Sequence, residues 1–247
     1  METTEEIIDT TTDDGQMAVL VTRPADAAPS GDWPVVLLFI DAPGIRGATH
    51  AFASKLAAEG YRVVTPDLHH RHGRLCNAMD TTPPDGKTAQ EMVWMWIASM
   101  TDAQIAHDAD RGLAAAGVDP QEPIVTIGFC LGARAVVRRM LSEPDRVLAG
   151  AGWHPSFLAD DDDDSPHLAA PTLRRPLYLG IGDADQIQSI DMHQRFLDAV
   201  EPLDHVRVDV LPGADHGYTW PGAPNYDELA ATTSWDATTA MFGAAFA

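Results

Sequence analysis

Residues 126–133 read TIGFCLGA, and this stretch decides the fold of the chain. It follows an apolar run at 123–125 and precedes a helix-like segment at 133–140. Glycines two positions before and after Cys130 predict a very tight strand-to-helix turn, because only small residues let the strand and the helix approach closely. Such a turn strains the backbone at Cys130 and places its sulfur at a helix N-terminus, where the helix dipole favours a thiolate.

The Gly-x-Cys-x-Gly pattern is that of the nucleophile elbow of an α/β-hydrolase, with cysteine where serine is usual. A lone cysteine between apolar residues is usually an inert core thiol. The flanking glycines and the strand-to-helix context favour a nucleophile at Cys130. In this fold the acid and then the histidine of a catalytic triad follow the nucleophile along the chain.

Residues 176–185 read PLYLGIGDAD, an apolar strand that runs into a turn. Carboxylates just past the carboxyl end of a strand lie at the catalytic edge of a parallel sheet. Asp185 lies further past the strand than Asp183 and can reach back over the edge. We therefore expect Asp185 to be the acid of the triad, and Asp183 to stabilise the turn.

Residues 205–211 alternate apolar and polar side chains as a strand does, and the loop PGADHGY follows at 212–218. His216 therefore lies just after a strand, where a general base can reach the elbow. A surface histidine is the alternative, but position and chain order favour the base. Cys130 would attack an ester or lactone carbonyl, His216 would move the proton, Asp185 would orient the imidazole, and the backbone N–H of Leu131 would donate to the oxyanion.

Taken together, these motifs resemble those of the dienelactone hydrolase family. The matching segments are GFCLGA at 128–133, GDAD at 182–185, GADHG at 213–217 and LLFIDAPGIR at 37–46. The resemblance implies hydrolysis of a small ester or lactone of the enol-lactone type, through a thiol ester and without a metal or organic cofactor. It also implies that the backbone N–H of Ala42 is the second oxyanion donor. Asp41 stands where the family often has a glutamate that tunes the thiol.

Family members that act on dienelactone hold the substrate carboxylate with arginines, one of them shortly after the catalytic histidine. Here residues 218–221 read YTWP, without arginine. This favours a substrate that lacks the carboxylate and a pocket with an apolar wall, although an aromatic loop residue is as often core cover. The candidate pocket residues are Arg46, His70, Trp153, His154, Tyr218 and Trp220.

The chain has 37 acidic and 16 basic residues, for a net charge of −21. A surface of this charge repels nucleic acid and anionic membranes. It fits a high-salt habitat, and a GC-rich genome that depletes lysine is the alternative. No apolar run reaches transmembrane length, and the acidic N-terminus is no signal peptide. Two cysteines, Cys76 and Cys130, fit a reducing cytoplasm, and we expect Cys76 to be free. The histidines at 69–72 beside Cys76 lack a second ligand pair, which argues against a metal site.

A chain of 247 residues predicts one α/β-hydrolase domain over 1–247, a monomer or small homo-oligomer, with helices on both faces of a mostly parallel sheet. We expect strands at 35–40, 62–64, 146–152, 177–181 and 205–211, and helices at 49–59, 89–116 and 226–245. Two alternatives keep this fold. One is a small-molecule binding or redox-sensing protein with a reactive Cys130, and the other is acyl transfer to an alcohol or thiol.

Overall fold

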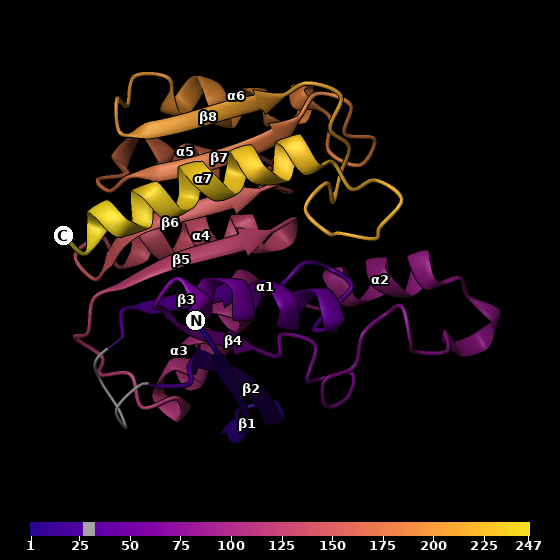
Figure 1. Ribbon diagram of the computed structural model, residues 1–247. Helices are drawn as coiled ribbons and strands as arrows, with labels where there is room; N and C mark the ends of the chain where they lie inside the picture. Colours follow the sequence, from indigo (N-terminus) through magenta and orange to yellow (C-terminus); the bar gives the residue numbers. More distant parts are fainter. Residues whose placement is uncertain (27–32) are drawn as a thin grey trace. The chain divides into compact units, whose positions relative to one another are not determined.

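Three strands open the chain, and helices and strands are interspersed after them, in the computed structural model, which describes residues 1–26 and 33–247 (Figure 1). The chain divides into two units, residues 1–122 and 123–247. The strands of the first unit pair in the order β1-β2-β4-β3, where the bounds are β1 Thr3–Thr12, β2 Gly15–Pro24, β4 Arg62–Pro66 and β3 Val35–Phe39. β1 and β4 run antiparallel to β2, and β3 runs parallel to β4.

Two helices, α1 (Gly47–Ala58) and α3 (Asp102–Ala115), pack on β2 and β4. Residues 17–21 of β2 are buried one after another. Successive strand residues point to opposite faces, so helices and neighbouring chain cover this strand on both sides.

The hairpin of β1 and β2 was not among the expected strands. Its first strand is rich in threonine, a β-branched residue that favours extended backbone. The turn is built locally, because the backbone N–H of Asp14 donates to Thr12 Oγ1 at 3.1 Å and Gly15 adopts a φ of 127°. An acidic strand on the outer side of a hairpin shows little apolar periodicity, which is why the sequence pattern missed it.

The single long helix predicted at 89–116 is wrong. The structure has two helices there, α2 (Ala89–Ala98) and α3, which begins after Thr101. Thr101 Oγ1 accepts from the backbone N–H of Gln104 at 3.2 Å, and Gln104 Oε1 accepts from the backbone N–H of Thr101 at 3.1 Å. This reciprocal capping box satisfies the free N–H groups of a new helix start, so the helical pattern restarts at this point.

All four strands of the second unit are parallel to their neighbours. They pair in the order β5-β6-β7-β8, with bounds β5 Ile124–Phe129, β6 Val147–Trp153, β7 Leu177–Gly182 and β8 Val206–Leu211. The parallel carboxyl ends bring the loops that follow these strands to one edge of the unit.

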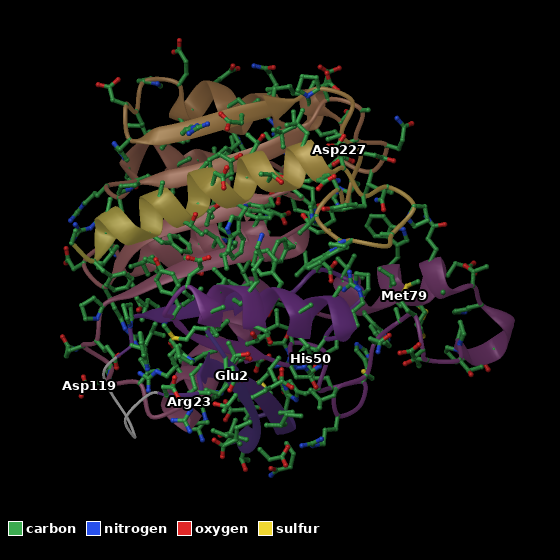
Figure 2. The ribbon with its side chains drawn as sticks, in the orientation of Figure 1. Glu2, Arg23, His50, Met79, Asp119 and Asp227 are labelled. Carbon is green, nitrogen blue, oxygen red and sulfur yellow. The ribbon has the colours of Figure 1, made fainter. Side chains whose placement is uncertain are left out.

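Helices cover both faces of this second sheet. Their bounds are α4 Leu131–Ser142, α5 Pro166–Ala169, α6 Ile190–Val200 and α7 Glu228–Ala245. Figure 1 shows α7, in yellow, on the near face and α4, α5 and α6 behind the strands. Asp227, labelled in Figure 2, starts α7 by accepting a hydrogen bond from the backbone N–H of Ala230 at 2.9 Å.

The other expected elements are present, with ends that differ by a few residues. The second unit alternates strands with helices and is parallel throughout, as the sequence predicts, whereas in the first unit only β3 and β4 form a parallel pair and β2 is antiparallel to both of its neighbours. That residues 1–247 form one domain stays a prediction.

Candidate active site

Cys130 is the single residue between the end of β5 and the start of α4. Its backbone has φ 54° and ψ −119°, a strained conformation for a residue with a side chain. Hydrogen bonds from the loop after β6 hold it there: the backbone N–H of Cys130 donates to the Trp153 carbonyl at 3.2 Å, and the backbone N–H of Ser156 donates to the Cys130 carbonyl at 2.9 Å. The predicted tight strand-to-helix turn is therefore present.

His216 lies in the loop after β8, and Asp185 lies in the loop after β7. His216 Nδ1 and Asp185 Oδ2 are 2.7 Å apart, and only 1% of the Asp185 side chain is exposed. The other carboxylate oxygen, Oδ1, accepts from the backbone N–H groups of Ile187 at 2.8 Å and Gln188 at 2.7 Å. Three donors thus fix the carboxylate in an orientation that directs it at the imidazole.

Asp183, the weaker candidate for the acid, accepts a hydrogen bond from the backbone N–H of Gly213 at 2.6 Å. This bond joins the loops after β7 and β8. The side chain is exposed and links two loops, and the local turn-stabilising role expected from the sequence stays a prediction.

Several opposing effects act on the pKa of His216. Burial lowers it, but the hydrogen bond with Asp185 and the sulfur of Cys130 raise it, and the outcome is a pKa of about 10. Within residues 1–26 and 33–247, the buried Nε2 atom has no hydrogen-bond partner at normal geometry. The imidazole is therefore held by Asp185 on one side and faces the sulfur through a nitrogen that is otherwise unused, which suits proton exchange with Cys130 or with a bound substrate.

A chain of ring contacts leads away from the imidazole of His216. The ring of His154 meets that of His216 edge-on, with centroids 4.9 Å apart, and Phe129 stacks on His154 at 5.8 Å. Trp220 lies 4.7 Å from Phe129 and 6.5 Å from His154. Of the candidate pocket residues in this unit, His154 contacts His216 directly, and Tyr218 and Trp220 lie 5.4 and 6.5 Å from His154.

Trp153 and Tyr218 have the contacts of core residues. The Trp153 indole N–H donates to Thr238 Oγ1 of α7 at 3.0 Å, and 1% of the residue is exposed. Tyr218 is fully buried, and its hydroxyl bonds Ser234 Oγ at 2.8 Å and donates to the Gly180 carbonyl at 3.3 Å. Burial is the main cause that raises the pKa of Tyr218 well above its ordinary value. These bonds tie α7 to β6 and β7.

The remaining candidates lie in the first unit. Asp41 and Arg46 form a two-pronged ion pair, with distances of 2.5 and 2.7 Å between guanidinium nitrogens and carboxylate oxygens. Ala42 is 5% exposed, and its carbonyl is 2.8 Å from His69 Nε2. The side chain of His70 is buried, with Nε2 3.4 Å from Asp108. The roles proposed for these residues stay predictions.

The histidines near Cys76 are engaged in protein contacts. Burial lowers the pKa of His69 to about 4, and its ring lies 4.9 Å from that of Trp96. The ring of His72 stacks on Trp96 at 5.1 Å, and its Nε2 lies 3.0 Å from Ser99 Oγ. Over the described residues, no group of three or more histidine, cysteine or acidic side chains is arranged to hold a metal ion. Cys76 is a free thiol, as expected.

Sequence reasoning missed two residues that contact the candidate triad. Ser156 Oγ lies 3.3 Å from Cys130 Sγ, and Gln188 links Asp185 to the loop after β6 because its Oε1 accepts from the backbone N–H of Phe157 at 3.2 Å. Ser156 follows a strand by three residues, so the rule that led to Asp185 would have included it. Gln188 carries no signal in the sequence, because its contact depends on two loops meeting.

The family model of the dienelactone hydrolase family matches this chain over residues 17–246. A protein of Salmonella typhi described as "Putative carboxymethylenebutenolidase" is 26% identical over 219 residues, which cover 84% of this chain and 76% of that protein.

Solved structures share the fold of this chain. A "Putative Dienelactone Hydrolase" from Klebsiella pneumoniae superposes with a TM-score of 0.82 at 22% identity, covering 98% of this chain and 99% of that one. A dienelactone hydrolase-like promiscuous phosphotriesterase from metagenomic libraries superposes with a TM-score of 0.74 at 21% identity, covering 98% of each chain. These likenesses confirm the predicted α/β-hydrolase fold class.

Among the described residues, no helix is both long and apolar enough to span a membrane.

Proposed function

The chain belongs to the dienelactone hydrolase family and is a hydrolase of that type, and we propose that it cleaves a small, activated ester or lactone through Cys130, His216 and Asp185. The observation that carries this proposal is the hydrogen bond of 2.7 Å between Asp185 and His216 beside a cysteine on a strained strand-to-helix turn. All three residues lie in the second unit, on loops at the carboxyl ends of its parallel strands.

In the first half-reaction the Cys130 thiolate attacks the carbonyl carbon, and the charge moves onto the carbonyl oxygen. The backbone N–H of Leu131, at the first position of α4, donates to that oxyanion with the support of the helix dipole. The bond from carbon to the leaving oxygen then breaks, and His216 gives its Nε2 proton to that oxygen. A thiol ester on Cys130 remains, and from a lactone the released enol or alcohol stays in the same acyl group.

In the second half-reaction a water molecule gives a proton to His216 and attacks the thiol ester. The carbon–sulfur bond breaks, the carboxylic acid leaves, and the Cys130 thiolate is restored. Asp185 holds the imidazole in the tautomer and orientation that both steps need and stabilises the imidazolium. The raised pKa of His216 supports this scheme, because the resting enzyme then holds an imidazolium that can protonate the leaving oxygen.

The nucleophile limits the leaving group. A thiol has a pKa of about 8.5, far below that of a simple alcohol, so the tetrahedral intermediate of an alkyl ester would expel the thiolate and return to substrate. An enol or phenol is a better leaving group than an alkyl alcohol. We therefore propose enol lactones and aryl esters as the substrate class. The second oxyanion donor, Ala42, and the thiol-tuning Asp41 belong to this proposal through the family resemblance.

The test is turnover of enol lactones and aryl esters by the wild type and by Cys130→Ala, at low and high salt, with Cys76→Ala as a matched thiol control. We expect Cys130→Ala to lose turnover with its circular dichroism spectrum unchanged, and Cys76→Ala to keep it. Mass spectrometry of the quenched enzyme should find the acyl group on Cys130. Full activity in Cys130→Ala would refute the proposal, and a folded wild type without turnover on any substrate would favour binding or redox sensing.

A further inference from the structure

The side chain of Ser156 is buried against the sulfur of Cys130. Only 1% of Ser156 is exposed, and its Oγ lies 3.3 Å from Cys130 Sγ. Among the described residues, Cys130 is the one hydrogen-bond partner of this hydroxyl. A buried hydroxyl is costly without a partner, so a hydroxyl that faces only the sulfur has to exchange a hydrogen bond with it.

Backbone contacts fix the position of Ser156 from several directions. Its own N–H donates to the Cys130 carbonyl at 2.9 Å, and the N–H of His154 donates to the Gly180 carbonyl at 2.8 Å. On the other side, the N–H of Phe157 donates to Gln188 and its carbonyl accepts from Arg134 Nη1 at 2.8 Å. The loop therefore has little freedom to move the hydroxyl away from the sulfur.

The backbone on either side of Ser156 is strained. His154 has a φ of 37° and Phe157 a φ of 59°, in the left-handed region that residues with side chains rarely adopt. Strain of this kind persists where surrounding contacts enforce it, and it gathers at functional sites. A plain connecting loop needs no such geometry.

We propose that Ser156 is a further catalytic residue, whose hydroxyl donates a hydrogen bond to the Cys130 thiolate and holds the sulfur in place for attack on the substrate. This inference rests on the proposed role of Cys130 as the nucleophile. A thiolate accepts hydrogen bonds but cannot donate one, so the hydroxyl hydrogen has to point at the sulfur. Hydrogen bonds to charged groups are about twice as strong as those between neutral groups.

The arrangement joins both ends of the triad. Asp185 accepts from the backbone of Gln188, the Gln188 side chain accepts from the backbone of Phe157, and the neighbouring Ser156 contacts Cys130. Two hydrogen bonds, joined through Gln188 and the Ser156–Phe157 peptide bond, thus link the carboxylate beside His216 to the hydroxyl beside the sulfur.

Other titratable groups face the same region of the second unit. They are His216 from the loop after β8, Asp185 from the loop after β7, His154 from the loop after β6, and His193 from α6, whose pKa burial lowers. Replacing Ser156 removes none of these groups. A change in the pH at which the Cys130 thiol ionises can therefore be assigned to loss of the Ser156 hydroxyl.

The experiment measures the rate at which iodoacetamide alkylates Cys130 across pH, in a Cys76→Ala background that leaves one thiol. The acid limb of this profile is the pH range in which the alkylation rate rises as the thiol ionises. We expect Ser156→Ala to shift that limb to higher pH by about one unit, which makes alkylation about tenfold slower at low pH. Ser156→Thr, which keeps a hydroxyl, should restore the wild-type profile. Ser165→Ala removes another buried serine hydroxyl of this unit, which bonds Asp160 and His167, and should leave the profile unchanged.

An unchanged or downward-shifted acid limb in Ser156→Ala would overturn the inference, because a hydroxyl that accepts from a neutral thiol stabilises the thiol instead. If Ser156→Ala does not fold, Ser156→Gly removes the same hydroxyl and is judged by the same shift. Alkylation needs no substrate, so this result stands apart from turnover. Absence of turnover with a shifted acid limb refutes the proposed hydrolysis, and turnover with an unshifted limb refutes the role of Ser156.

Discussion

Replacing Gly128 with alanine would place a methyl group against the backbone of the first turn of α4. A Cβ atom at this position would lie 2.2 Å from the Gly132 carbonyl oxygen, 2.3 Å from the Gly132 carbonyl carbon and 2.9 Å from the nitrogen of Ala133. Ordinary van der Waals contact begins at 3.4 Å. Strand and helix would have to separate by about 1 Å to admit the methyl group.

No flexible side chain can absorb this movement, because all three atoms belong to the backbone. Overpacking of a rigid site costs about 1–3 kcal/mol and occasionally more, and we expect about 3 kcal/mol here. The movement would also change the backbone at Cys130, which lies between the strand and the helix. We therefore expect Gly128→Ala to lose turnover of an aryl ester along with stability.

Urea unfolding followed by circular dichroism measures the first effect. A loss of about 3 kcal/mol should lower the midpoint by about 1 M or more. Gly243→Ala is the matched control, because a Cβ there meets no atom within 4 Å and alanine favours the helix α7 more than glycine does. We expect its midpoint to equal or exceed that of the wild type. A Gly128→Ala protein with the wild-type midpoint would refute the steric reasoning.

Three further predictions concern the triad and the last helix. Asp185→Asn should fold but lower kcat/KM for an aryl ester by about a hundredfold or more, because the amide no longer stabilises the imidazolium, and activity within tenfold of the wild type would contradict its role. The raised pKa of His216 contributes stability that is complete below its ordinary value of 6.5 and lost as pH rises through about 10. Above about pH 8.5, where an unfolded cysteine is already ionised, the urea midpoint of the wild type should therefore fall more steeply than that of His216→Gln, and parallel curves would argue against the shift. Asp227→Ala removes the cap of α7 and should cost about 1 kcal/mol in urea unfolding, whereas equal midpoints would show that the cap contributes nothing.

Local patterns predicted most of the second unit. A strand, a turn between glycines and a helix need only short-range chemistry, so the elbow at Cys130 could be located without coordinates. The same holds for Asp185 and His216, because each follows an apolar strand and parallel strands end at one edge. The prediction of one helix over 89–116 was wrong. The apolar pattern continues past residue 100, but the capping box at Thr101 starts a second helix there.

The outer hairpin and several pocket candidates lay beyond such patterns. The exposed, threonine-rich β1 lacks the apolar alternation that marks a strand. It is recognised as a strand only by its antiparallel pairing with β2. Aromatic residues near a catalytic loop can face the substrate or the core, and composition does not distinguish the two. The structure does so for Tyr218 and Trp153, whose polar atoms bond Ser234 and Thr238 beneath α7.

The sequence by itself determined the order in which a candidate nucleophile, acid and base follow the strands, and it predicted their roles. These properties depend on residue type and on backbone geometry within a few residues. Only the tertiary structure decided which groups support them. The contact of Ser156 with the Cys130 sulfur and the bond of Gln188 to the loop after β6 join segments 26 and 31 residues apart. Contacts over such distances depend on how the strands are ordered and how their loops pack, and no local pattern encodes them.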